Sequence, residues 1–158
     1  MEDTEHLFDG VGAPGPEARA NGAAILASGL TREAQLLAAT AADLSTTLNF
    51  FPVDSQGPEA EDRRVMRDGA REASALAGAL LIVARQIMRQ PDDPAEAARQ
   101  TLGRLPRGTL TTGEILSHLR TAALLTLTDD GAARVAAGTL AEIFEREFTA
   151  AWTKAKGG

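Results

Sequence analysis

Apolar residues recur from Leu30 to Phe51 at alternating steps of four and three residues, the spacing of one face of an α-helix. The positions on this face are Leu30, Ala34, Leu37, Ala41, Leu44, Leu48 and Phe51. A half-buried β-strand would alternate with period two and would be much shorter. The spacing therefore predicts a long helix that Thr31 caps at its N-terminus and that ends before Pro52.

A second run with the same spacing follows a predicted loop over residues 53–58. It extends over about residues 59–89, and its members are Met66, Ala70, Ala73, Ala77, Leu80, Ala84 and Ile87. Because alanine supplies most of these positions, two helix axes can approach closely along them. The two runs predict a tight antiparallel hairpin of helices over residues 31–89.

A short helix is predicted ahead of this hairpin. Pro16 is suited to the first turn of a helix, because its missing N–H leaves no hydrogen bond unmade there. This helix would span residues 17–28. Asn21, Gly22 and Gly29 weaken this helix because their helix propensity is low, and the next helix starts at its own N-cap, Thr31.

Caps and turns delimit three helices in the second half of the chain. Residues 93–96 combine an N-cap, a first-turn proline and a capping-box acid, so they start a short helix that ends near Gly103. A helix over residues 112–127 follows, and its buried face comprises Ile115, Leu116, Leu119, Ala123 and Leu127. The turn of residues 128–131 then caps a last helix, whose apolar face comprises Ala133, Ala137, Leu140, Phe144, Phe148 and Ala151. These two helices predict a second antiparallel hairpin over residues 111–155.

The predicted fold class is all-α: a bundle of four main helices with one or two short helices, arranged as antiparallel helical hairpins. The composition agrees, because aromatic residues make up only 4% of the chain and strands favour aromatic and β-branched residues. A length of 158 residues with 44% hydrophobic residues is enough for one core. We therefore expect a single helical-bundle domain over residues 16–158, preceded by an acidic tail over residues 1–15.

The net charge of −6 is concentrated in the N-terminal segment. Residues 1–17 contain five of the 22 acidic residues and none of the 16 basic ones, so the rest of the chain is nearly neutral. Such a body lacks the positive field that non-specific nucleic-acid binding requires. The absence of cysteine excludes disulfides, thiol catalysis and thiolate metal sites. No apolar stretch approaches the ~20 residues of a membrane span and no signal peptide is visible, so we expect a cytoplasmic protein.

Glu114 and His118 are candidates for metal chemistry, because they lie four residues apart on one helical face, as in half of a carboxylate–histidine site. A complete site needs three or four ligands and the sequence supplies no further set, so we interpret them as a surface pair. The chain also has no recognisable nucleophile motif and no Gly-rich phosphate loop. We therefore expect neither an enzyme nor a bound cofactor or metal.

Four arginines crowd the start of the helix predicted over residues 59–89: Arg63, Arg64, Arg67 and Arg71. Such a stripe can contact an anion or a phosphate backbone. Five acidic residues interleave with it and can form ion pairs at i,i+3 and i,i+4, so a solvated face of mixed charge is the favoured interpretation. The anion contact stays as an alternative.

Two groups of apolar residues are candidates for binding a partner. In the tail, Leu7 and Phe8 stand among acidic residues and can dock into a groove of a partner or of a second copy. The two long helices also carry four apolar residues that the contact between them does not need to bury: Leu36, Leu76, Leu81 and Val83. Leftover apolar surface on helical bundles commonly packs against another chain.

The leading hypothesis for function is a non-catalytic protein–protein interaction or assembly module, namely a self-associating adaptor or structural subunit. The first alternative is a regulatory protein that binds DNA or a small ligand, because the two helices over residues 111–155 resemble a helix-turn-helix in outline. Asp129 and Asp130 at the start of the second helix would repel phosphate, which favours an ordinary hairpin. The second alternative is a small helical metal protein or enzyme built around Glu114 and His118.

Overall fold

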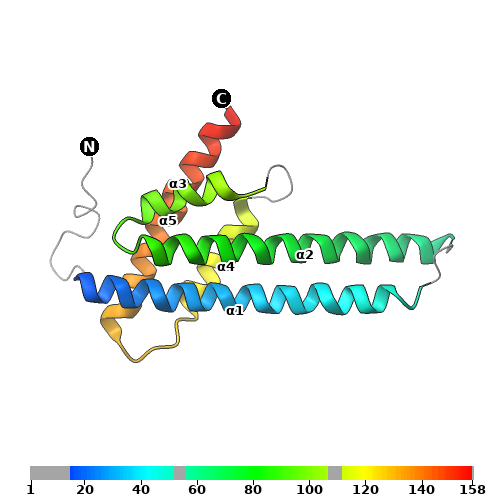
Figure 1. Ribbon diagram of the computed structural model, residues 1–158, viewed down its shortest axis with the longest axis horizontal. Coiled ribbons are helices and arrows are strands. Elements are labelled where there is room, and N and C mark those ends of the chain that lie inside the picture. Colours follow the sequence, from blue (N-terminus) through cyan, green and yellow to red (C-terminus); the bar gives the residue numbers. More distant parts are fainter. Residues whose placement is uncertain (1–14, 52–55, 107–111, 158) are drawn as a thin grey trace.

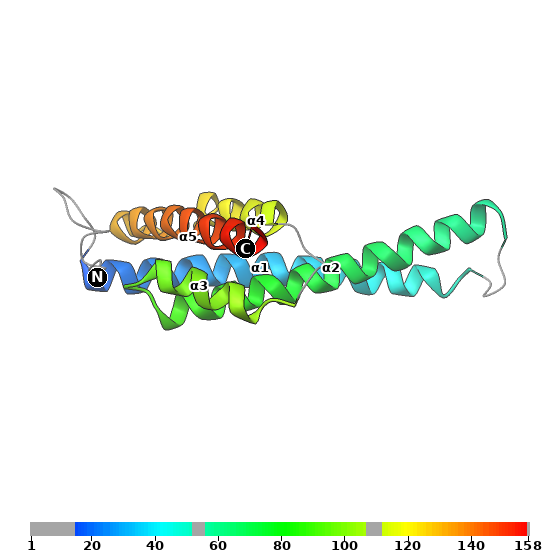
Figure 2. The ribbon, with the colours of Figure 1, turned by 90° about the horizontal axis from the view of Figure 1, so that it is seen from above.

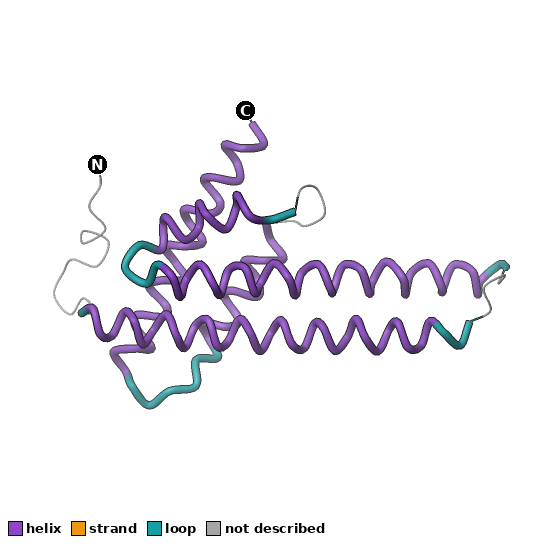
Figure 3. The backbone as a smooth tube through the Cα atoms, in the orientation of Figure 1, coloured by secondary structure: helices purple, strands orange, loops and turns teal. Residues whose placement is uncertain are grey.

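The computed structural model describes residues 15–51, 56–106 and 112–157, and in these ranges the chain forms five α-helices and no strand (Figure 3). In chain order the helices are α1 (Pro16–Leu48), α2 (Pro58–Arg89), α3 (Pro94–Arg104), α4 (Thr112–Leu124) and α5 (Gly131–Gly157). The predicted all-α class is therefore confirmed. Residues 1–14 of the predicted tail and residues 53–55 of the predicted loop lie outside the described residues.

The helices are arranged in two layers. In the first layer, α1 and α2 lie side by side and antiparallel, with the most extensive contact between any two described helices, and α3 packs beside α2 (Figure 1). The predicted hairpin of two long helices is therefore confirmed. In the second layer, α4 and α5 cross one side of the α1–α2 pair (Figure 2). Because α5 packs more extensively on α1 and α3 than on α4, the predicted second hairpin is a minor contact.

The separate short helix predicted at the start of the domain is not observed. α1 is continuous over its whole length, and Thr31 does not cap a helix but lies inside α1. There its hydroxyl donates a hydrogen bond of 2.8 Å to the carbonyl of Ala27. The prediction was wrong because it weighed local propensity alone, whereas packing against other helices outweighs the low propensity of Gly22 and Gly29.

These two glycines are the positions where the second layer crosses α1. A Cβ atom added at Gly22 would lie 2.8 Å from both the Cβ of Ala136 and the amide nitrogen of Ala137 in α5. A Cβ atom added at Gly29 would lie 3.2 Å from the Cβ of Ala122 in α4. The small residues on both sides of each crossing therefore set the distance between the two layers.

The core lies between the two layers. Its largest fully buried apolar side chains are Leu26, Leu30, Leu80, Val83, Ile87, Ile115, Leu119, Leu140, Phe144 and Phe148. Phe144 and Phe148 stack with their ring centroids 5.7 Å apart, and Trp152 extends the stack at 6.1 Å from Phe148. Leu127, which was predicted to be buried, is exposed, because α4 ends at Leu124 and Leu127 falls in the loop beyond it.

Polar contacts fix helix ends and join neighbouring helices. Asp93 caps α3 as predicted, because its carboxylate accepts a hydrogen bond of 3.1 Å from the amide of Glu96. Arg120 of α4 pairs with Glu145 of α5. The hydrogen bond from the Arg120 guanidinium lowers the pKa of the Glu145 carboxyl, so this pair is charged on both sides at neutral pH.

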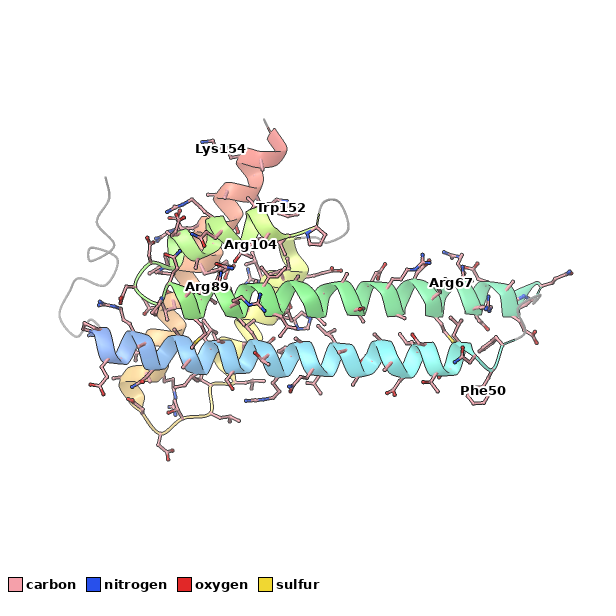
Figure 4. All side chains as sticks on the ribbon, viewed as in Figure 1. Phe50, Arg67, Arg89, Arg104, Trp152 and Lys154 are labelled. Atoms are coloured by element: carbon pink, nitrogen blue, oxygen red, sulfur yellow. The ribbon has the colours of Figure 1, made fainter. Side chains whose placement is uncertain are left out.

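Beyond the second layer, α1 and α2 continue together as a two-helix arm (Figures 1 and 2). The arm comprises residues 35–51 and 56–75, and the rest of the described chain is the head. Among the described arm residues, only Ala41 is buried. Phe50 stands at the far end of the arm and is almost fully exposed (Figure 4). Two helices alone cannot enclose a seam on all sides, so the large apolar side chains of the arm stay partly exposed.

The close crossing at Gly22 predicts that an alanine there destabilises the protein, although alanine has the higher helix propensity. Gly22→Ala should lower the free energy of unfolding by about 1–3 kcal/mol, because overpacking against α5 exceeds the propensity gain of up to ~1 kcal/mol. The control is Gly78→Ala in α2, where an added Cβ meets nothing within 4 Å. This control should raise the free energy of unfolding by up to ~1 kcal/mol. Urea denaturation measures the free energy of unfolding of both variants. A higher free energy of unfolding for both would contradict close packing of α5 on Gly22.

Candidate interaction surfaces

Three large apolar side chains within four residues, at and just after the end of α4, are exposed. Leu124, Leu125 and Leu127 are exposed to 84%, 59% and 76%. We call these three residues the leucine patch. Single exposed leucines are common on protein surfaces. Leu125 and Leu127 line the same cleft, and apolar side chains gathered at a cleft indicate a binding surface.

A cleft of about 200 Å³ lies between the leucine patch and α1. The described residues that line it are Ala24, Ile25, Ser28, Gly29, Arg32, Ala122, Leu125, Thr126 and Leu127. Most of these residues are apolar or small, and Arg32 is the single charged residue among them. The cleft therefore suits an apolar side chain with an acidic group beside it.

The loop between α4 and α5 is held by hydrogen bonds within the turn. The amide of Asp130 donates to the hydroxyl of Thr128 at 3.1 Å, and the Asp130 carboxylate accepts from the amide of Ala133 at 3.1 Å. The predicted turn and cap over residues 128–131 are therefore confirmed. Arg134 donates to the carbonyl of Thr128, so the guanidinium is engaged by the backbone of its own loop.

The residues predicted to bind a partner divide into three groups. Leu36 and Leu81 are exposed, as an interface residue must be before its partner binds. Leu76 and Val83 are buried in the core, so the prediction was wrong for them. Both lie on the side of α2 that the head covers, and their apolar character is used within the chain. Leu7 and Phe8 lie outside the described residues.

The leucine patch is the feature that sequence reasoning missed. A signal was present, because three leucines within four residues are too closely spaced to share one face of a helix. Only Leu127 was singled out, and it was placed on the buried face of a longer helix. Where α4 ends decides the exposure of these side chains, and helix ends are poorly specified by apolar spacing.

The arginines at the start of α2 are interleaved with acids as the sequence suggested. Arg64 pairs with Glu61, and its guanidinium also donates to Asp68 at 3.2 Å. The hydrogen bond from Arg64 lowers the pKa of the Glu61 carboxyl. Arg63 and Arg67 are half-buried, and Arg71 is exposed. A solvated mixed-charge face describes Arg64 well, and an anion contact by the four arginines stays a prediction.

His118 does not pair with Glu114. Its Nδ1 lies 3.3 Å from a carboxylate oxygen of Glu33 in α1, so the histidine joins the two layers. Glu114 is exposed and makes no contact with it. In the part of the chain that the structure describes, no three histidine or acidic side chains gather as metal ligands.

The chain matches no protein family model, no curated protein and no solved structure. Among the described helices, none is long and apolar enough to cross a bilayer. The surfaces of the molecule therefore carry the functional argument.

The cap at Asp130 predicts how strongly the turn supports α5. Asp130→Ala should lower the free energy of unfolding by about 1 kcal/mol, because the amide of Ala133 loses its acceptor. Asp129→Ala is the matched control, since Asp129 is exposed and caps nothing, and its effect should stay within about 0.5 kcal/mol. Thermal or urea unfolding distinguishes the two variants, and equal losses would contradict the assignment of the cap.

A buried amide in α2 predicts a stabilising substitution. Gln86 is fully buried, and neither polar atom of its side chain has a hydrogen-bond partner among the described residues. Gln86→Met keeps the shape and removes the unsatisfied groups, so the free energy of unfolding should rise by about 1 kcal/mol. The exposed Gln35→Met is the control and should change it by less than about 0.5 kcal/mol. A loss of stability in Gln86→Met would show that the amide is satisfied in solution.

Proposed function

We propose that the protein is a non-catalytic protein–protein interaction or assembly module, a self-associating adaptor or structural subunit. The observation that carries the proposal is the leucine patch. Burying a leucine side chain fully stabilises an assembly by about 1.5–3 kcal/mol, so covering three exposed leucines is worth several kcal/mol. A monomer that works alone gains nothing from keeping such a cluster in water.

The cleft beside the patch indicates the kind of segment that binds there. Ile25, Leu125 and Leu127 supply apolar lining to the cleft. Arg32 at the same cleft favours a carboxylate beside the inserted apolar side chain. An amphipathic helix or short apolar segment of another protein, flanked by acidic residues, fits these features.

Two contacts favour this proposal over the alternatives. A metal centre at His118 is disfavoured, because this histidine is paired with Glu33 across the layers. DNA reading by α5 is disfavoured, because the carboxylate of Asp130 occupies its N-terminus and Arg134 is engaged by the loop. Neither alternative has an observation of its own that supports it.

The leucine patch predicts a differential result in affinity capture. The double variant Leu124→Glu, Leu127→Glu should capture about tenfold less of the proteins that the wild type captures from the cell of origin. The reason is that a charge in a buried apolar contact costs at least about 1.4 kcal/mol of binding free energy. Both side chains are exposed, so circular dichroism and thermal unfolding should stay close to wild type. Met88→Glu, at an exposed position of α2 outside the cleft, is the control and should retain them. Equal capture by wild type and double variant would contradict the proposal.

A further inference from the structure

The cleft beside the leucine patch has the size of one large side chain. Its volume is about 200 Å³. For comparison, a cavity of roughly 150 Å³ with apolar walls holds one benzene molecule. Ile25, Leu125 and Leu127 give the cleft its apolar lining. The cleft therefore suits one phenylalanine or leucine side chain that a short segment presents.

The N-terminal tail of the chain contains a segment with this chemistry. Leu7 and Phe8 are adjacent large apolar residues, and Glu5 and Asp9 stand on either side of them. Residues 1–14 contain no lysine and no arginine, and they lie outside the residues that the structure describes. An apolar pair flanked by carboxylates is the kind of segment that matches an apolar cleft with an arginine at its edge.

The tail is attached near the cleft, at the end of the molecule where α1 starts (Figure 1). Ile25 and Ser28, which line the cleft, follow Gly15 by 10 and 13 residues, or roughly 15 and 20 Å along the helix axis. Phe8 precedes Gly15 by seven residues, and seven extended residues span at most roughly 25 Å. The tail of the same copy is therefore long enough to reach the cleft.

The linker between Asp9 and α1 suits a path back along the helix. Such a path needs a reversal of the chain, and three of the six residues 10–15 are glycine, which enters turns at little steric cost. Residues 10–15 also carry no charged side chain, so Glu17 in the first turn of α1 does not repel them. The acidic part of the tail lies farther from Glu17, where it meets the cleft.

Charge along α1 favours an acidic segment at the cleft. Between Arg19 and Arg32 the helix has no charged residue, and no acidic side chain among the described residues pairs with the exposed Arg32. Arg32 lies four helical residues beyond Ser28, or roughly 6 Å. Glu5 lies two residues beyond Leu7, or roughly 7 Å in an extended chain. A tail with Leu7 at Ser28 therefore brings Glu5 to Arg32.

The carboxylates of the neighbouring loop do not form a uniform acidic field. Asp129 and Asp130 follow Leu127, the last residue that lines the cleft, and Asp130 caps α5 through its carboxylate. The guanidinium of Arg134 donates to the carbonyl of Thr128, so a positive charge lies in the same loop. One of the two negative charges is thereby offset.

Attachment within one chain favours the chain's own tail over the tail of a second copy. A short flexible linker holds an attached segment near its site at a millimolar effective concentration. A second copy at micromolar concentration supplies the same segment at about a thousandth of that level.

We propose that residues 5–9 dock into the cleft of their own chain, with an apolar side chain in the cleft and Glu5 paired with Arg32. The inference rests on the proposed function, because the docked tail covers part of the surface assigned to a partner. A partner then binds only molecules whose tail has left the cleft, so the tail lowers the apparent affinity for that partner.

Paramagnetic NMR of the full chain tests the contact. The chain has no cysteine, so Thr4→Cys carries a nitroxide label at one position next to the docking segment. The label should broaden the amide signals of Ile25, Ser28 and Leu125. A spin-labelled copy without ¹⁵N, mixed at micromolar concentration with a ¹⁵N-labelled copy without nitroxide, should leave these signals sharp.

A variant of the tail tests its apolar residues. In the spin-labelled chain, Leu7→Ser, Phe8→Ser should lower the ratio of docked to free tail by about tenfold or more, because two apolar side chains lose their burial. Val11→Ser, Ala13→Ser is the matched control. It replaces apolar residues of the same tail outside the docking segment and should leave the broadening unchanged.

A charge exchange tests the ion pair. Arg32→Glu should weaken the broadening, because the exposed guanidinium is replaced by a carboxylate that repels Glu5. Adding Glu5→Arg to this variant should restore the broadening, because the two charges are again opposite. An exchange that restores nothing would contradict the pairing of Glu5 with Arg32.

Three further outcomes would overturn the inference. They are sharp signals in the spin-labelled chain, equal broadening in the Leu7→Ser, Phe8→Ser variant and in the chain with an unchanged tail, and equal broadening in the mixed sample. The last of these would show that the tail docks between two copies.

Failure of the inference is distinguishable from failure of the proposed function. If the tail stays free while Leu124→Glu, Leu127→Glu loses the captured proteins, the proposed function stands without the tail contact. If the tail docks while this variant captures as much as the wild type, the tail contact stands and the proposed function fails. Where both hold, Leu7→Ser, Phe8→Ser should capture more protein than the wild type, and unchanged capture would contradict competition by the tail.

Discussion

The close crossing of α1 by α5 at Gly22 and by α4 at Gly29 is the constraint on which the rest of the structure depends. Because no side chain separates the helices there, the second layer lies directly against the α1–α2 pair and encloses the core. Both crossings fall in the N-terminal half of α1, so the second layer covers the head and stops before the arm. The arm and the leucine patch are the two apolar surfaces that this placement leaves open.

Apolar spacing was a sufficient guide where one helix meets one neighbour. It predicted α2 and the hairpin, because each apolar seam packs against one facing helix. The cap at Asp93 was also predicted, because a cap depends only on residues next to it in the sequence. It failed where a third helix decides the outcome. Gly22 and Gly29 have low helix propensity. They lie within a continuous helix because α5 and α4 pack against α1 at these two positions.

The same distinction explains which interface residues could be predicted. Leu76 and Leu36 are both apolar residues outside the hairpin seam, and the sequence does not tell which of them another element covers. The head covers Leu76, whereas Leu36 lies beyond its edge. The exposure of the leucine patch depends on where α4 ends, and apolar spacing specifies helix ends poorly.

The two open surfaces lie at opposite ends of one helix. α4 begins on the arm side of the head and ends at the leucine patch (Figure 1). Its 13 residues span roughly 20 Å at 1.5 Å per residue, so a partner bound at the leucine patch leaves the arm exposed.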